Sequence, residues 1–568
     1  MTTAQERFEY WLTNLTGDAL AELQKIQNDQ SAVQECFHSE LAFGTAGLRG
    51  ILGLGSGRMN SYTVRHATQG FSQYLLEACA STTPSVAIAY DSRRCSQEFA
   101  REAACVFAAN GLTVHMYRQL MPTPALSYAV RELHCDAGVV ITASHNPAEY
   151  NGYKAYDHTG CQLNLQAAEK VMQQMQQCDL FSAPKHIGFS EALADGKIRW
   201  IPEEFVQRYL ARVLQESLQP KHIRDAGLKI VYTPLNGAGN RPVRTVLERA
   251  GIANMIVVPE QELPDSSFST CPYPNPEVPE ALRLGLALCR KTGAELLIAT
   301  DPDCDRIAVA VPSGADYTIL TGNEAGVLLI DYIARTRKAL GTLPANAIAV
   351  KSIVSSHLAQ LVAEEYGITM VNVLTGFKYI GGIIHELELA GQADRFVFAF
   401  EESCGYLTGA YVRDKDAVNA ALLLAEAASA YKLQGQTLLD VLNDIYARHG
   451  IFRNIVDSHT FAGVQGLAAM KTIMAQLRQS PPAAIAGDPV AAYTDYLAPA
   501  TAGQASLPPA DMLEYTLQNG CSIIVRPSGT EPKIKIYYSL VAKSQKDVDA
   551  LAARYRLAGR QLLGLQGK

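Results

Sequence analysis

Short apolar runs that end abruptly in polar residues recur along the chain, and they constrain its fold more than any other feature. Examples, rich in Val, Ile and Ala, span residues 85–93, 138–147, 229–239, 296–306, 347–356, 396–405 and 522–531. Continuous apolar runs without alternation are typical of strands buried on both faces, as in parallel sheets. Helical patterns lie between them, as at 99–111 and 242–252, each with a glycine suited to a helix C-cap. The alternation predicts an α/β fold.

The length predicts several domains. Single hydrophobic cores stop growing at roughly 250–300 residues, and this chain has 568. Recurrence of the same strand-then-loop unit suggests several similar α/β domains. A stretch rich in Pro, Ala and Gly at 480–511 interrupts the pattern. It is interpreted as a loop or insertion within the last domain, or alternatively as a linker.

Charge and cysteine usage exclude several classes of protein. The net charge of -7 gives the chain no global reason to bind nucleic acid or anionic membranes. No run of about 18 apolar residues predicts a membrane span, and the first residues lack the layout of a signal peptide. The 12 cysteines form no C-x-x-C pair, which disfavours zinc ribbons and thioredoxin motifs. Reduced thiols and a cytoplasmic location are expected.

The segment TASHNPAEYNGYK (142–154) offers a candidate nucleophile. Ser144 follows an expected strand, and Asn146-Pro147 favours a turn that would expose it. An exposed serine beside His145 is suited to nucleophilic chemistry. For an isolated S-H-N-P segment the commoner alternative is a serine-initiated turn with a neighbouring polar histidine.

The segment DPDCDR (301–306) predicts a metal site. Asp301, Asp303 and Asp305 alternate, so they share one face of an extended segment. Close carboxylates repel each other by about 1 kcal/mol or more per pair unless a positive charge lies among them. A hard divalent cation with oxygen ligands satisfies that requirement. An EF-hand would need Gly and Glu where Arg306 and Pro312 stand, and a solvated acidic turn is the alternative.

The segment RPSGTEPKIK (526–535) gathers donors for an anion. Arg526 offers a planar fork for phosphate, and Gly529 permits backbone N–H groups to turn inward. Hydroxyls and further positive charge come from Ser528, Thr530, Lys533 and Lys535. The alternative is a Pro/Gly turn between two strands, which must exist in either case.

Three further segments are weak when taken singly: FGTAGLRG (43–50), GFKYIGG (376–382) and FEESCGYL (400–407). The glycines of the first allow close backbone approach beside Arg49, but they match neither a Walker A nor a dinucleotide fingerprint. Lys378 could hold a phosphate or move a proton, and Glu401 and Ser403 could bind sugar hydroxyls. A solvated loop and a surface lysine are the alternatives.

Taken together and in this order, the motifs resemble the α-D-phosphohexomutase superfamily. The resemblance covers nearly the whole chain, and its details are similar to the phosphoglucomutase/phosphomannomutase type, in the branch that includes phosphopentomutases. It implies three related, mixed or parallel α/β sandwich domains and a smaller C-terminal α+β domain around a central active-site cleft. The expected domains are 1–210 with the phosphoserine loop, 211–322 with the metal loop, 323–455 with the sugar loop and 456–568 with the phosphate loop.

The resemblance also implies a role for each motif. Ser144 would be the phosphorylated serine, next to His145. Asp301, Asp303 and Asp305 would hold one Mg²⁺ together with an oxygen of the Ser144 phosphate. Arg49 and Arg306 would steady the phosphoserine, and Lys154, with a pKa lowered by nearby cations and burial, would move a proton, with Lys378 as its partner. Sugar and phosphate binding would fall to Thr375, Gly376, Glu401, Ser403, Arg526, Ser528, Gly529 and Thr530.

The implied reaction interconverts α-D-glucose 1-phosphate and glucose 6-phosphate through a phosphoserine enzyme and glucose 1,6-bisphosphate, which also serves as activator. The expected partner is a phosphosugar, with no nucleic acid or membrane, and the expected state is a monomer or small homo-oligomer. Mannose or pentose phosphates remain alternatives, followed by a sugar-phosphate hydrolase or a non-catalytic binding protein. Asn236 departs from the family pattern, where histidine is expected, and leaves the role of its loop open.

Overall fold

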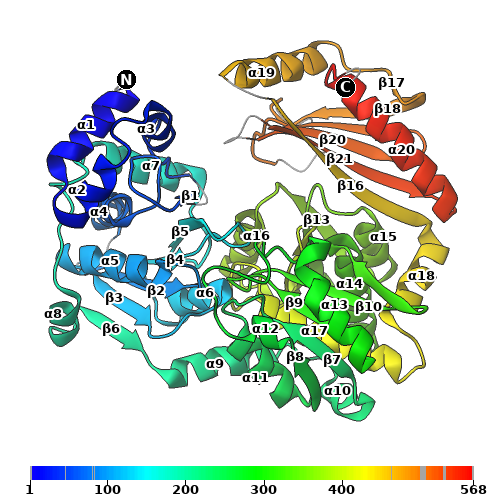
Figure 1. Ribbon diagram of the computed structural model, residues 1–568. Helices are drawn as coiled ribbons and strands as arrows, with labels where there is room; N and C mark the ends of the chain where they lie inside the picture. Colours follow the sequence, from blue (N-terminus) through cyan, green and yellow to red (C-terminus); the bar gives the residue numbers. More distant parts are fainter. Residues whose placement is uncertain are drawn as a thin grey trace. The chain divides into compact units, whose positions relative to one another are not determined.

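The computed structural model describes residues 3–44, 47–79, 81, 83–461, 464–498, 507–528 and 533–565 (Figure 1). The chain divides into two compact units. The first comprises Met1–Leu320, Ile380–Val397 and Cys404–Gly435. The second comprises Thr321–Tyr379, Phe398–Ser403 and Gln436–Lys568.

Three helices that the sequence patterns did not predict open the chain: α1 (Ala4–Asn14), α2 (Gly17–Gln24) and α3 (Gln30–Phe37). Helix α1 begins at a capping box, in which Thr3 and Glu6 each accept a backbone N–H of the other. Trp11 and Phe37 are buried with ring centroids 5.7 Å apart in an edge-on arrangement. These helices therefore have a small aromatic core of their own.

The first sheet has the strand order β1-β5-β4-β2-β3-β6. Its strands are β1 (Leu48–Ile51), β2 (Ser85–Tyr90), β3 (Thr113–Tyr117), β4 (Ala137–Ile141), β5 (Tyr150–Asp157) and β6 (Ile198–Ile201). Strand β2 is parallel to β3 and β4, whereas β5 is antiparallel to β4. The helices here are α4 (Ser61–Ala78), α5 (Ser96–Ala109), α6 (Thr123–Glu132), α7 (Leu165–Gln176), α8 (Phe189–Ala194) and α9 (Glu203–Leu214).

The second sheet has the order β11-β10-β9-β7-β8. Its strands are β7 (Lys229–Thr233), β8 (Asn254–Val257), β9 (Leu296–Thr300), β10 (Ile307–Ser313) and β11 (Asp316–Leu320). Strand β7 is parallel to β8 and β9, and β10 is antiparallel to β9. The helices are α10 (Pro220–Ala226), α11 (Asn240–Ala250), α12 (Pro259–Glu262), η1 (Pro279–Leu282) and α13 (Arg283–Thr292).

The third sheet has the order β13-β12-β14-β15. Its strands are β12 (Ile348–Ser352), β13 (Thr369–Val373), β14 (Phe396–Glu401) and β15 (Gly405–Leu407), and β12 is parallel to β13. The helices are α14 (Gly322–Ala339), α15 (Leu358–Glu365), α16 (Phe377–Leu389), η2 (Ala393–Arg395), α17 (Ala417–Lys432) and α18 (Leu438–His449).

These three sheets share one topology, as the repeated strand-then-loop unit predicted. Each sheet contains a unit of four strands. Numbered by their order along the chain, these strands lie in the spatial order fourth, third, first, second: β5-β4-β2-β3, β10-β9-β7-β8 and β15-β14-β12-β13. Every residue of β4, β9 and β12 is buried, which confirms that the continuous apolar runs are interior strands. The chain therefore contains three related α/β domains.

The fourth sheet is antiparallel, with the order β16-β21-β20-β19-β18-β17. Its strands are β16 (Ile451–Thr460), β17 (Ala484–Ile485), β18 (Asp488–Asp495), β19 (Leu513–Leu517), β20 (Ser522–Pro527) and β21 (Lys533–Ala542), and its helices are α19 (Val464–Gln479) and α20 (Gln545–Leu562). An antiparallel sheet with helices that do not alternate regularly with its strands is typical of an α+β domain.

The interpretation of 480–511 as a loop or insertion within the last domain holds only in part, and the alternative of a linker is wrong, because strands β17 and β18 of the fourth sheet lie in this stretch. Strand β18 pairs with β17 on one side and with β19 on the other. The Pro/Gly pattern indicated a turn correctly only at residues 486–487, where Ala486 (φ 54°) and Gly487 (φ 86°) form the turn of the β17–β18 hairpin. Residues 490–495, VAAYTD, have the side chains of a strand.

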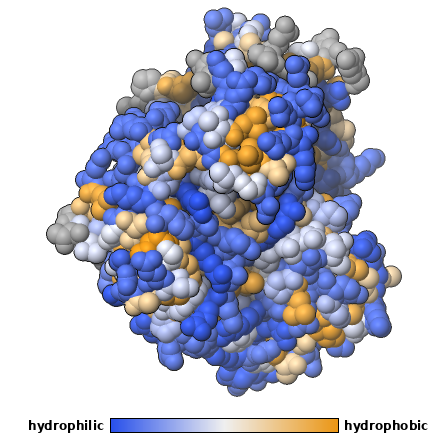
Figure 2. Space-filling view, turned by 60° about the vertical axis from the view of Figure 1, so that its left-hand side comes forward, coloured by the Kyte–Doolittle hydropathy of each residue, from blue (hydrophilic) through white to orange (hydrophobic). Residues whose placement is uncertain are grey.

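Hydrophilic side chains predominate on the face shown in Figure 2, where hydrophobic residues form small separate groups. Such a distribution is typical of a surface in contact with water. The twelve cysteines are free thiols, as expected. Within the described part of the chain, no helix has both the length and the apolar character that a membrane crossing requires.

Candidate functional site

Three of the motifs occupy the same topological position, at the end of the third strand of the shared four-strand unit. Ser144 lies between β4 and β5, the aspartates lie between β9 and β10, and Glu401 ends β14 with residues 402–404 between it and β15. Each loop contains a non-glycine residue with a left-handed backbone: Ser144 (φ 54°), Cys304 (φ 53°) and Cys404 (φ 61°). Such conformations are costly and cluster at functional sites. The repeated fold therefore presents its chemistry-bearing side chains from equivalent sharp loops.

Ser144 is fixed by hydrogen bonds on both sides. Its backbone N–H donates to Thr142 Oγ1 at 2.8 Å, and its Oγ lies 3.1 Å from Asp301 Oδ2 and 3.1 Å from His145 Nδ1. The prediction of an exposed serine is wrong, because only 3% of the residue is exposed. The aspartate loop of the second sheet packs against the serine loop and supplies the acceptor for its hydroxyl.

A buried arginine that the sequence analysis missed holds the serine loop. The Arg93 guanidinium donates to the backbone carbonyls of Ser144 (2.6 Å), Pro147 (2.8 Å), Tyr150 (3.2 Å) and Asn146. It also lies 3.3 Å from the carboxylate of Asp91, and both side chains are fully buried. Asp91 directly follows strand β2 and Arg93 comes two residues later. Polar residues at the carboxyl ends of parallel strands are candidates for a site, and this signal could have found both. They position Ser144 rather than reach a substrate.

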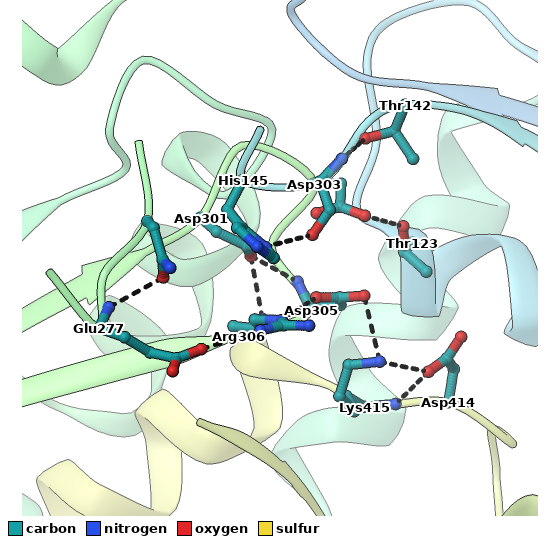
Figure 3. Close-up of polar contacts among 12 residues, drawn as sticks. Thr123, Thr142, His145, Glu277, Asp301, Asp303, Asp305, Arg306, Asp414 and Lys415 are labelled. Atoms are coloured by element: carbon teal, nitrogen blue, oxygen red, sulfur yellow. Dashed lines mark hydrogen bonds and ion pairs between the residues drawn. The ribbon is translucent and has the colours of Figure 1, made fainter. Parts of the chain in front are cut away.

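The three aspartates of DPDCDR converge. All three are buried, and one carboxylate oxygen of each lies within 4.8 Å of the others (Figure 3). Asp301 Oδ1 accepts the backbone N–H groups of Asp305 and Arg306, at 3.1 and 3.0 Å, and so closes the loop. Burial and the two neighbouring carboxylates raise the pKa of Asp301 well above its ordinary value. A negative charge on Asp301 is therefore disfavoured beside the other two carboxylates unless a further cation joins the cluster.

The remaining oxygens fit a divalent cation. Oδ1 of Asp303 and Oδ1 of Asp305 are buried and accept no hydrogen bond from any residue that the structure describes. Oδ2 of Asp303 accepts hydrogen bonds from Thr123 Oγ1 at 2.8 Å and from Lys154 Nζ at 2.7 Å. Buried carboxylate oxygens without donors are costly. A hard cation with oxygen ligands satisfies them, so these residues could hold the expected metal.

Lys154 lies against the aspartates from strand β5. Its Nζ is 2.7 Å from Asp303 Oδ2 and 3.2 Å from Asp305 Oδ2, in a side chain that is almost fully buried. Burial by itself would lower the pKa of Lys154, but the two carboxylates outweigh that effect and raise the pKa. The expectation of a lowered pKa is wrong for this arrangement, because it considered neighbouring cations and not the carboxylates.

Two arginines and a histidine surround the serine loop. Arg49 is exposed and donates to Asn146 Oδ1 at 3.3 Å, and Arg306 donates to Glu277 Oε1 at 2.9 Å. Burial, followed by the charges of Arg306 and Arg49, lowers the pKa of His145 well below its ordinary value. A neutral imidazole can accept the Ser144 hydroxyl through Nδ1. The first unit therefore brings together every predicted residue of the serine and metal motifs.

The loop between β7 and α11, whose role the sequence left open, supports the aspartate loop. Asn236 (φ 57°) donates to the backbone carbonyl of Leu263 at 2.7 Å. A Cβ at Gly237 would lie 2.4 Å from Pro302 Cα, so the absence of a side chain there permits close packing. The Ala238 N–H donates to the Pro302 carbonyl at 2.7 Å. Asn236 thus ties its own loop to the backbone of Glu260 and Leu263, and the neighbouring Gly237 and Ala238 support the metal loop.

In the second unit, the sugar-loop residues of the third sheet lie together. The Gly376 N–H donates to Glu401 Oε1 at 2.6 Å, and the Glu401 side chain is buried. Thr375 and Ser403 are half-buried. Lys378 lies in the first turn of helix α16, with its Nζ 5.0 Å from the ring centre of Tyr379, and burial lowers the pKa of Lys378.

Arg526 and Ser528 lie at the end of strand β20. The Ser528 N–H donates to the Lys533 carbonyl at 2.7 Å and closes the loop. Burial and then the Glu402 carboxylate raise the pKa of Tyr537 to about 12, while the Arg526 guanidinium acts in the opposite direction. Arg526 therefore lies beside the end of the sugar loop. Gly529 and Thr530 lie outside the described residues.

Comparison with known proteins decides the family. Models of the phosphoglucomutase/phosphomannomutase α/β/α domains I, II and III match residues 40–180, 207–314 and 321–449, and the model of the C-terminal domain matches residues 468–558. The chain belongs to this family. It is 38% identical over 518 residues to a phosphoglucomutase of Staphylococcus epidermidis, covering 89% of this chain and 92% of that protein.

Further relatives agree with this assignment. The chain is 35% identical over 554 residues to a phosphoglucomutase of Staphylococcus aureus, covering 95% of this chain and 96% of that protein. Among solved structures, pp63/parafusin, a phosphoglucomutase from Paramecium, matches with a TM-score of 0.71 at 17% identity, covering 93% and 96% of the two chains. A putative phosphomannomutase from Thermus thermophilus matches with a TM-score of 0.68 at 22% identity, covering 93% and 99%. The structural likenesses establish the fold.

Proposed function

We propose that this protein interconverts α-D-glucose 1-phosphate and glucose 6-phosphate. Phosphorylated Ser144 gives its phosphoryl group to the free 6-hydroxyl of glucose 1-phosphate, which forms glucose 1,6-bisphosphate and frees the Ser144 hydroxyl. The bisphosphate turns around, and Ser144 takes the phosphoryl group from position 1. Glucose 6-phosphate leaves, and the enzyme is phosphorylated again.

The observation that carries this proposal is the position of the Ser144 hydroxyl. Its Oγ lies 3.1 Å from Asp301 Oδ2, at the edge of a buried cluster of three carboxylates. A serine in such a place would be poorly suited to carry a phosphoryl group without a cation, because the added negative charge would face carboxylates. Mg²⁺ held by the aspartates would neutralise the phosphoryl oxygens and weaken the hold of the carboxylates on the Lys154 proton.

The side chains around Ser144 divide the remaining work. Arg49 and Arg306 would stabilise charge on the phosphoserine. Lys154 would take the proton from the accepting hydroxyl and return it in the second transfer. Neutral His145 orients the Ser144 hydroxyl through the 3.1 Å contact of Nδ1 with Oγ.

The second unit would bind the rest of the substrate. Glu401 and Ser403 offer acceptors for sugar hydroxyls, beside Thr375, Gly376 and Lys378. Arg526, Ser528, Gly529 and Thr530 would hold the phosphate that is not reacting. A phosphate-binding site separate from the nucleophile can accept either phosphate of the bisphosphate. The reorientation of the intermediate requires this.

Several accompanying expectations belong to the same proposal. The domains would be 1–210, 211–322, 323–455 and 456–568, and the enzyme would be a monomer or a small homo-oligomer. Glucose 1,6-bisphosphate would act as an activator by phosphorylating Ser144. The free thiols fit a reducing compartment such as the cytoplasm.

A substrate panel tests the proposal. The values of kcat/KM are measured for the 1-phosphates of glucose, mannose and ribose, with Mg²⁺ and a trace of glucose 1,6-bisphosphate. We expect a clear preference for glucose 1-phosphate. Preference for mannose or ribose 1-phosphate would retain the mechanism and replace the substrate. Release of inorganic phosphate without isomerisation would identify a hydrolase, and inactivity of a folded protein towards all three sugars would favour a binding protein.

Replacing Arg526 with alanine is expected to weaken substrate binding by about 2–3 kcal/mol, because charge-assisted hydrogen bonds to phosphate are lost. This corresponds to a loss of about 30- to 150-fold in kcat/KM. The loss should appear mainly in KM, since this phosphate-binding site holds a phosphate that does not react. Arg556→Ala is the control, because Arg556 pairs with Asp457 at 2.8 Å elsewhere in the same domain. A fall in kcat with KM unchanged would contradict the assignment of Arg526 to binding.

A further inference from the structure

The segment 413–416, RDKD, lies between strand β15 and helix α17 and is buried along its whole length. Asp416 caps helix α17 by accepting the backbone N–H groups of Val418 and Asn419. Asp414 Oδ2 accepts the hydroxyl of Tyr156 at 2.7 Å. Tyr156 follows Lys154 by two residues on strand β5, so both side chains lie on the same face of that strand. The segment is therefore tied to the strand that carries Lys154.

Lys415 extends from this segment to the metal loop. Its Nζ lies 3.3 Å from Asp305 Oδ2 and 3.1 Å from Asp414 Oδ1, and its side chain is 8% exposed (Figure 3). The stem of the lysine passes over Gly405, where a Cβ would lie 2.1 Å from Lys415 Cδ. The absence of a side chain at residue 405 thus leaves the space that the Lys415 side chain occupies.

Lys415 and Lys154 hold the same oxygen of Asp305. Lys154 Nζ lies 3.2 Å from Asp305 Oδ2, the atom that Lys415 also approaches. The other oxygen, Oδ1, accepts no hydrogen bond within the described part of the chain. Two cations on one oxygen restrict the rotation of the carboxylate, and Oδ1, which lies 3.8 Å from Arg306 Nε without a hydrogen bond, is the oxygen left to meet a further cation. Asp303 is oriented in the same manner, since its Oδ2 accepts hydrogen bonds from Thr123 and Lys154.

We propose that Lys415 is a positioning residue that orients Asp305 for a divalent cation. The inference rests on the metal site of the proposed function. Groups that orient metal ligands contribute to metal affinity although they do not touch the metal. The proposal predicts the direction in which the cation affinity changes when Lys415 is removed. Lys415 carries a positive charge near the site, so simple electrostatics predicts that its removal tightens cation binding, whereas loss of orientation weakens it.

Binding of Mn²⁺ to the full-length protein, followed by the EPR signal of the free ion, tests the sign. Each sample is brought to one phosphorylation state, checked by intact mass. Lys415→Met removes the ammonium and keeps the stem, and we expect the Kd for Mn²⁺ to rise about 10-fold or more. Lys415→Arg restores a cation and should bind Mn²⁺ more tightly than Lys415→Met. The control is Lys432→Met, because Lys432 pairs with Glu295 at 2.7 Å at a partly exposed position.

An unchanged or lower Kd in folded Lys415→Met would overturn the proposal, as would an arginine variant no tighter than the methionine variant. If Lys415→Met fails to fold, Gly405→Ala decides, because it displaces the Lys415 stem and keeps every charge. We expect weaker Mn²⁺ binding there also, and wild-type affinity would overturn the proposal. Binding needs no turnover, so these results are distinguishable from failure of the mutase proposal in the substrate panel.

Discussion

Replacing Ser144 with alanine is expected to abolish turnover while the protein remains folded. The Oγ atom is the proposed phosphoryl carrier, and removal of a nucleophile of this kind costs roughly 10⁴-fold or more in kcat. Alanine at the left-handed backbone of residue 144 (φ 54°) carries strain of about 1–2 kcal/mol, which serine bears already. The measurements are turnover with glucose 1-phosphate, a denaturant melt, and the mass shift after incubation with glucose 1,6-bisphosphate.

Ser144→Gly is the matched comparison. It also lacks Oγ, so it should be equally inactive and show no added phosphate. Glycine relieves the backbone strain, so this variant should unfold at a denaturant concentration no lower than that of Ser144→Ala. Turnover close to wild type in either variant would refute the mechanism. Turnover loss with retained phosphorylation would show that another residue carries the phosphoryl group.

The fold was predictable where the signal was local and strong. The segments 138–147 and 296–306 each begin with a short apolar run typical of an interior strand, and the polar residues that follow mark the site. Helices α1–α3 were missed because no strand pattern accompanies them. Their core depends on packing of Trp11 against Phe37, which lie far apart in sequence. Strand β18 was missed because its hairpin signal is surrounded by Pro and Ala.

The site was predictable as a set of motifs but not as a set of contacts. Short spacing identified the three aspartates and Ser144, because they lie within two segments. Arg93 contacts the serine segment although it lies 51 residues before Ser144. Lys415 contacts the aspartate segment from another domain. No spacing rule connects either residue with the segment that it contacts. The pKa of Lys154 could not be assigned from its own segment either. Its direction depends on Asp303 and Asp305, which are brought to it by the fold.

Replacing Asp303 with asparagine is expected to lower turnover roughly 10³-fold, which corresponds to the several kcal/mol that a metal contributes to phosphoryl transfer. The Asp303 side chain is completely buried, with Oδ2 engaged by Thr123 and Lys154. Asparagine keeps the volume but turns one end into a donor. If the new NH₂ group points towards Thr123 and Lys154, it meets two other hydrogen-bond donors. If it points towards the cation, it presents hydrogen-bond donors to a positive charge instead of a ligand oxygen.

The experiment measures kcat against Mg²⁺ concentration, together with the loss of activity on chelation. Asp316→Asn is the control, since Asp316 pairs with Arg290 at 2.8 Å at an exposed position of the same sheet. If Asp303 acts through affinity alone, high Mg²⁺ should restore turnover. If its charge also acts in the transition state, the deficit persists at saturating Mg²⁺. Wild-type turnover and Mg²⁺ dependence in Asp303→Asn would exclude Asp303 as a ligand, and the orphaned oxygen in the buried cluster would then need another cation.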